Sequence, residues 1–212
     1  DSRDLPSAAE LQKCLLPNPL ELDNYQVESF FQPSAYLSGD WYDYWKLNED
    51  EVLFYLADVS GHGVTSSLLT SWMAAFHGRS KTPKELIQKL NTMLVQENIE
   101  KHITMVAGIL NTITNEVQWC SAGHYPPPII FEPDQAPQIL STSSFPLGLI
   151  EDLDIQEHRC VLNCHARFIV CSDCSFDLYD GGLIDQFNQL VDFLQKYAFT
   201  APEHVAVDFV IL

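Results

Sequence analysis

Acidic residues stand beside several apolar segments, where carboxylates from distant parts of the chain can meet and bind metal ions. The four candidates are Asp40, Asp58, Asp173 and Glu203. Ligand sets made only of oxygen select hard cations such as Mg²⁺ or Mn²⁺. Two such ions held roughly 4 Å apart can activate a water molecule and clamp a phosphoryl group. Taken singly, Asp40, Asp173 and Glu203 fit turn or capping residues better; only together would these carboxylates permit metal-assisted chemistry on a phosphoryl group.

Asp58 has the most informative setting of the four. It lies near the end of the apolar run Glu51–Val59, which predicts a buried strand, and Ser60-Gly61-His62-Gly63 follows directly. The glycines permit a tight turn that leaves amides and carbonyls exposed before a helix begins. The carboxylate can then point into a cleft, with the Val59 carbonyl beside it, or it can cap the helix. Spacing alone leaves both interpretations open.

The elements that position these residues are strands interrupted by helices. We expect helices near 64–77, 83–98 and 184–197. Strands are expected at 25–33, 51–59, 103–110, 116–122, 129–131, 159–162, 167–172 and 205–212. This order predicts an α+β fold with mostly antiparallel sheets, not repeated βαβ units. In the first helix, apolar spacing predicts one buried face, made of Thr65, Leu68, Leu69, Trp72, Met73 and Phe76.

The composition is that of an acidic globular domain. The chain has 212 residues, of which 46% are hydrophobic and 19% charged, a balance that argues against disorder. Its net charge of −18 disfavours nucleic acid and anionic lipid as partners. No apolar run approaches the roughly 20 residues of a membrane span, and no secretory signal is visible. We therefore expect a cytoplasmic location. Because the chain begins at Asp1, we also expect it to be a piece of a longer protein.

The cysteines raise the separate hypothesis of a zinc-stabilised interaction module. Four of the six lie within 15 residues, at 160, 164, 171 and 174, with His158 and His165 among them. The spacing does not form two CxxC pairs, and the apolar segment before Cys171 predicts a strand, whose alternate side chains point to opposite faces. We expect buried thiols in preference to a zinc site.

Five ordered blocks carry a resemblance to a known family: SGDWYDYW, LADVSGHG, SAGHYPP, FPLGL and SDCSFD. They resemble the SpoIIE/RsbU-like branch of the metal-dependent serine/threonine protein phosphatases, the PPM or type 2C fold. The resemblance extends from about Leu11 to the C-terminus. It implies an α-β-β-α sandwich of two antiparallel sheets flanked by helices. It also implies a linker helix at 1–18 and a phosphatase domain at 19–212.

The resemblance further implies a set of site residues. Asp40, Asp58 and Asp173 are the implied catalytic residues; with the Val59 carbonyl and Glu203 they would hold two Mn²⁺ or Mg²⁺ ions. Gly39, His62 and His204 are additional candidates, and His124 is expected to stabilise a turn. The implied reaction is in-line hydrolysis of phosphoserine or phosphothreonine without a covalent enzyme intermediate. His62 either gives a proton to the leaving alkoxide or hydrogen-bonds within its loop.

The family pattern is not matched everywhere. Ser38 and Cys174 replace glycines, and Glu203-His204 replaces a pair of aspartates. An alternative function is therefore a weak or inactive phosphatase-like domain that acts as a protein-binding adaptor.

The N-terminal segment Leu11-Gln12-Lys13-Cys14-Leu15-Leu16-Pro17 resembles the helix that leads into this catalytic domain, often after a sensory or receiver domain. We therefore expect the output domain of a bacterial signalling protein, of response-regulator or stress-signalling type. The expected partners are an upstream receiver or sensor domain and a phosphorylated regulatory protein such as an anti-sigma factor antagonist. A homodimer through the N-terminal helix is a further expectation.

Overall fold

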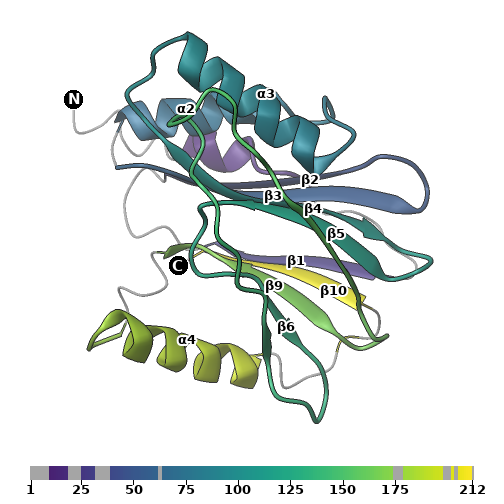
Figure 1. Cartoon of the computed structure of the whole chain (residues 1–212). Coiled ribbons are helices and arrows are strands. Elements are labelled where there is room, and N and C mark those ends of the chain that lie inside the picture. The colour runs from purple at the N-terminus through teal and green to yellow at the C-terminus, as the bar shows by residue number, and fades with distance from the viewer. Residues whose placement is uncertain are drawn as a thin grey trace.

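The computed structural model describes residues 10–18, 25–31, 39–61, 64–173, 179–197, 202 and 205–211, and its architecture is a layered sandwich. Two five-stranded sheets stack on each other, with α2 (Val64–Ala74) and α3 (Pro83–Gln96) over one and α4 (Leu183–Tyr197) beside the other (Figure 1). The predicted α-β-β-α sandwich is confirmed. None of the helices in the described part of the chain is both long enough and apolar enough to cross a membrane.

The sheet beneath α2 and α3, here called the meander sheet, is antiparallel throughout. Its strands in spatial order are β2 (Asp40–Lys46), β3 (Glu51–Val59), β4 (Ile103–Asn111), β5 (Glu116–Ala122) and β8 (Glu157–Val161). Alternate side chains of β3 pack into two different hydrophobic cores, one on each face of the sheet. Leu53 and Tyr55 pack with the helices, while Phe54 and Leu56 pack against the other sheet. Because both faces are covered, the strand is apolar along nearly its whole length.

The second sheet, here called the mixed sheet, differs from the expectation in strand direction. Its strands in spatial order are β1 (Tyr25–Phe31), β10 (Val205–Ile211), β9 (Arg167–Cys171), β6 (Ile129–Phe131) and β7 (Gln138–Ile139). β10 runs parallel to both β1 and β9, whereas β6 pairs antiparallel with β9 and β7. The parallel pair β9–β10 is physically permitted because α4 connects the two strands as a crossover.

The buried face of α2 also differs from the prediction. Leu68 is 65% exposed and Thr65 is exposed as well, so the prediction was wrong for both. Small polar residues face the sheet in their place, because their hydroxyl groups find partners in the backbone: Thr70 Oγ1 donates to the Ser67 carbonyl at 2.7 Å. The buried residues of α2 are Ser66, Ser67, Leu69, Thr70 and Met73.

A short helical segment at residues 10–14 packs against α2. Gln12 is buried, and its Nε2 donates a hydrogen bond to Thr70 Oγ1 at 2.7 Å. Leu16 packs against the cores on both faces of the meander sheet, while Leu11 and Leu15 are exposed. The Gln12 hydrogen bond and the Leu16 side chain therefore help to attach this segment to the sandwich.

Candidate metal centre

Three of the predicted carboxylates meet between the two sheets. Asp40, Asp58 and Asp173 each place one carboxylate oxygen within 4.8 Å of the others, and we call this group the acidic cluster. Asp40 lies in β2, Asp58 in β3, and Asp173 two residues after β9 ends. The meander sheet thus contributes two of the carboxylates and the mixed sheet contributes the third.

Strand register explains why the two aspartates of the meander sheet converge. Asp40 is directly opposite Asp58 in the β2–β3 pair, and Thr104 is directly opposite Asp58 in the β3–β4 pair. Side chains directly opposite each other on paired strands lie on the same face. Asp58 has the same parity along β3 as Leu56, which packs toward the mixed sheet. The three side chains therefore form a row that faces the strands that lead to Asp173.

The backbone beside this row comes unusually close together. A Cβ atom at residue 39 would lie 3.0 Å from the Val59 carbonyl oxygen and 3.3 Å from that of Gly61, and the Val59 amide donates to the Gly39 carbonyl at 3.0 Å. Lys101 Nζ donates to the Ser60 carbonyl at 3.2 Å. Gly39 therefore permits the close approach that brings the Val59 loop beside Asp40.

The electrostatics of the acidic cluster favour a bound cation. Burial, followed by repulsion from Asp40 and Asp173, raises the pKa of Asp58 from 3.8 to about 9. Asp40 is buried, Asp58 is half-buried and Asp173 is exposed, so the cluster opens to solvent on one side. Carboxylate oxygens are the donors that hard divalent cations prefer, and such a cation would offset the repulsion. The donor set fits a divalent metal ion.

The remaining predicted residues divide into two groups. Gly39 and Val59 lie beside the acidic cluster, as described above. His62, Cys174, Glu203 and His204 lie outside the described residues. Thr104 and Lys101 were not singled out from the sequence. No motif marks Thr104, because its place opposite Asp58 depends on strand register, and Lys101 is an isolated lysine in a short connection.

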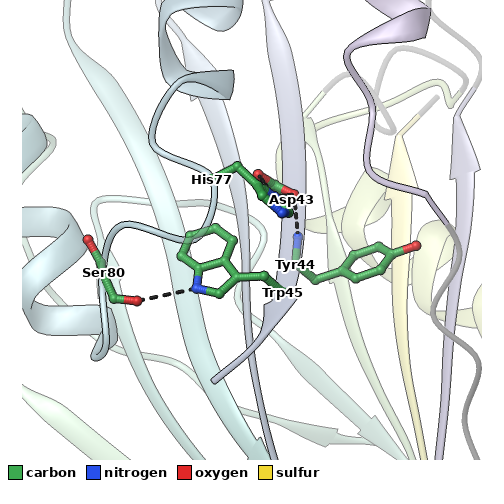
Figure 2. A network of polar contacts seen from close by, with 5 residues as sticks. All are labelled: Asp43, Tyr44, Trp45, His77 and Ser80. Carbon is green, nitrogen blue, oxygen red and sulfur yellow. Dashed lines mark hydrogen bonds and ion pairs between the residues drawn. The ribbon is translucent and has the colours of Figure 1, made fainter. Parts of the chain in front are cut away.

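A second polar network lies on the opposite face of β2. The buried Asp43 carboxylate accepts from the Tyr44 amide at 2.7 Å, and both its oxygens lie 2.9 Å from His77 Nδ1 (Figure 2). Trp45 Nε1 donates to the Ser80 carbonyl at 3.2 Å. Burial raises the pKa of Asp43, and His77 opposes this rise. Because Asp43 is an odd number of residues from Asp40, the strand directs it toward the helices and away from the acidic cluster.

Comparison with known proteins gives the family. The family model described as stage II sporulation protein E (SpoIIE) matches residues 48–210. The chain belongs to the SpoIIE family. The resemblance expected from the five sequence blocks is thereby confirmed. Over 185 residues the chain is 28% identical to the phosphoserine phosphatase RsbP of Bacillus subtilis, a match that covers 82% of this chain and 45% of RsbP. The chain therefore spans less than half the length of this relative.

Solved structures share the fold. The RsbU and RsbW domains of Rv1364c from Mycobacterium tuberculosis align with a TM-score of 0.69 and 22% identity, over 86% of this chain and 53% of that one. The SiaA-PP2C domain of Pseudomonas aeruginosa aligns with a TM-score of 0.67 and 16% identity, over 95% of this chain and 92% of that one. The sandwich is thus the PP2C fold over nearly its full extent.

Proposed function

We propose that this chain is the catalytic domain of a metal-dependent protein phosphatase that hydrolyses phosphoserine or phosphothreonine on a regulatory protein. The acidic cluster is the observation that carries this proposal, because it gathers three carboxylates at an opening between the sheets. Membership of the SpoIIE family and the PP2C fold support the same activity.

We assign the cluster residues as ligands of two divalent cations, Mn²⁺ or Mg²⁺. Asp40, Asp58 and Asp173 would hold the ions, with the Val59 carbonyl and Glu203 as further ligands and His204 as an additional candidate. When bound, such ions supply the positive charge that makes a water molecule more acidic and neutralises a phosphoryl group. Gly39 keeps the Val59 loop close to Asp40. His62 either gives a proton to the leaving alkoxide or holds its own loop in place.

Three of the described cysteines, Cys120, Cys160 and Cys171, do not fit the other common route, in which a thiolate attacks phosphorus. Burial raises the pKa of Cys120 to about 12 and that of Cys160 to about 11, and it raises the pKa of Cys171 as well. A protonated thiol is a poor nucleophile. The acidic cluster, by contrast, is built from groups that serve as metal ligands at neutral pH.

Turnover of p-nitrophenyl phosphate and of a phosphoserine peptide tests the activity. We expect hydrolysis that requires Mn²⁺ or Mg²⁺ and that is lost in Asp58→Asn. Asp134→Asn is the matched control, because Asp134 is exposed in a turn with a φ of 59°, a conformation that Asn also tolerates. Turnover that persists in chelator, or that survives in Asp58→Asn, would exclude the proposed mechanism.

An adaptor function is the second candidate, because Cys174 and Glu203-His204 depart from the family pattern. In that case the wild type would bind Mn²⁺ and retain a phosphorylated partner without releasing phosphate. Measuring metal binding and phosphate release on the same sample separates the two functions.

We further propose that the domain, at residues 19–212, is the cytoplasmic output of a bacterial signalling protein and follows a linker helix at 1–18. The linker would connect an upstream receiver or sensor domain, and an anti-sigma factor antagonist is the proposed kind of substrate. The exposed Leu11 and Leu15 give the linker an apolar surface for a homodimer. Light scattering of the wild type and of Leu11→Ser tests the dimer; an unchanged mass would exclude this contact.

A further inference from the structure

We propose that His124 is a positioning residue that ties the two sheets together and sets the place of Asp173 relative to Asp40 and Asp58. The inference rests on the proposed function, because it concerns the geometry of the same metal site. It goes beyond the turn-stabilising role expected from the sequence, since the partners of the imidazole lie in different sheets.

The imidazole spans the space between the sheets. His124 is buried, with its Nε2 atom 2.7 Å from the Cys171 carbonyl oxygen and its Nδ1 atom 3.2 Å from Thr104 Oγ1. Thr104 lies in β4, directly opposite Asp58. Cys171 is the last residue of β9, two residues before Asp173. The His124 side chain therefore connects Thr104, the strand partner of Asp58, to the segment that leads to Asp173.

The chemistry of the partners fixes the direction of both hydrogen bonds. A carbonyl oxygen only accepts, so Nε2 carries a proton and donates to Cys171. Burial lowers the pKa of His124, so the ring is neutral at pH 7 and Nδ1 is an acceptor. The Thr104 hydroxyl then donates to Nδ1. Both ring nitrogens are satisfied, which holds the plane of the imidazole in one orientation.

The loop that carries His124 is itself fixed to the meander sheet. Residue 123 forms a bridge with Met105, and its amide donates to Ser144 Oγ at 2.8 Å. Gly123 has a φ of +62°, and a Cβ atom there would lie only 2.7 Å from Pro146. His124 therefore projects from an anchored loop, and the end of β9 is held against it.

Four variants separate positioning from general stabilisation. His124→Ala removes both hydrogen bonds, whereas His124→Gln places an amide nitrogen near the position of Nε2 and keeps a donor for Cys171. Thr104→Val removes only the bond to Nδ1. Thr112→Val is the matched control, because Thr112 Oγ1 donates to the Asp50 carbonyl at 3.0 Å just beyond the other end of β4.

Calorimetric titration with Mn²⁺, together with thermal unfolding in chelator, tests the proposal. Loss of a residue that orients metal ligands typically weakens metal affinity 10- to 100-fold. We expect a loss of about 10-fold or more in His124→Ala, a smaller loss in Thr104→Val and partial recovery in His124→Gln. Thr112→Val should lower the unfolding temperature and leave Mn²⁺ affinity unchanged.

The outcomes distinguish this proposal from the proposed function. Wild-type affinity for Mn²⁺ in His124→Ala overturns the positioning role alone, and so does an equal loss in Thr112→Val. If His124→Ala does not fold, Thr104→Val takes its place in the test. A Mn²⁺ affinity that falls no further in Thr104→Val than in Thr112→Val then overturns the positioning role. A wild-type protein that binds no Mn²⁺ overturns the metal site and the positioning role together.

Discussion

The metal-free protein should become less stable as pH rises, because the acidic cluster retains a proton that the unfolded chain releases. The pKa of Asp58 is about 9 in the folded protein and 3.8 in the absence of burial and neighbouring charges. Between these values the folded state binds one more proton than the unfolded state. The free energy of unfolding then falls with rising pH, by about 1.36 kcal/mol per pH unit for a full proton.

The interval from pH 6 to pH 9 isolates this effect, because ordinary carboxylates are already ionised there. If the folded state holds one extra proton over these three pH units, the free energy of unfolding falls by ~4 kcal/mol. Asp58 is half-buried and water screens part of the repulsion, so we expect a loss of ~2 kcal/mol. In Asp58→Asn the group cannot ionise, and this component of the pH dependence should disappear.

Urea unfolding in chelator at pH 6, 7, 8 and 9 measures the difference between wild type and Asp58→Asn, with Asp134→Asn as the control. Titration of the histidines is common to all three proteins and cancels in the comparison. Saturating Mn²⁺ should reverse the trend in the wild type, because the cation binds the ionised carboxylates. A difference between wild type and Asp58→Asn that stays constant with pH would refute the reasoning.

Four further predictions concern the rest of the molecule. Chelation of metal should lower the unfolding temperature of the wild type but not of Asp58→Asn, which scanning calorimetry measures. His77→Ala should destabilise the fold by ~1–2 kcal/mol in urea unfolding, because it leaves the Asp43 carboxylate buried without the imidazole. Gly108→Ala should cost about 1–3 kcal/mol in the same assay, because a Cβ there would lie 2.5 Å from the Phe54 ring. Gln12→Ala should increase proteolytic cleavage near residues 10–18 while the core stays protected.

Local sequence patterns predict much of the fold. The strand over Glu51–Val59 has the expected bounds because both its faces are buried, and a continuous apolar run is easily recognised. The start of α3 is marked just as locally, by Thr82 followed by Pro83, and the Glu85 amide donates to Thr82 Oγ1 at 3.1 Å. The parallel pairing of β10 was not predictable in this way, because strand direction is decided by contacts between distant segments.

The candidate site shows the same division between local and distant information. Their places beside apolar segments and the family blocks singled out Asp40, Asp58 and Asp173, and the structure brings them together. Their common face depends on the register of β2 with β3, which no local motif encodes. The contacts of His124 were missed for the same reason, since its partners lie 20 and 47 residues away along the chain. The role of Glu203 stays a prediction.

The pairing of β1 with β10 has a consequence for how the polypeptide is made. Among the described residues β1 is the first strand and β10 is the last, and β10 lies between β1 and β9 in the sheet. During synthesis on the ribosome, β2 to β5 can assemble as soon as they emerge, because each pairs with the next along the chain. β1 finds this partner only after β10 has been synthesised. A nascent chain stalled before β10 has emerged would therefore expose the edge of β9 to other chains.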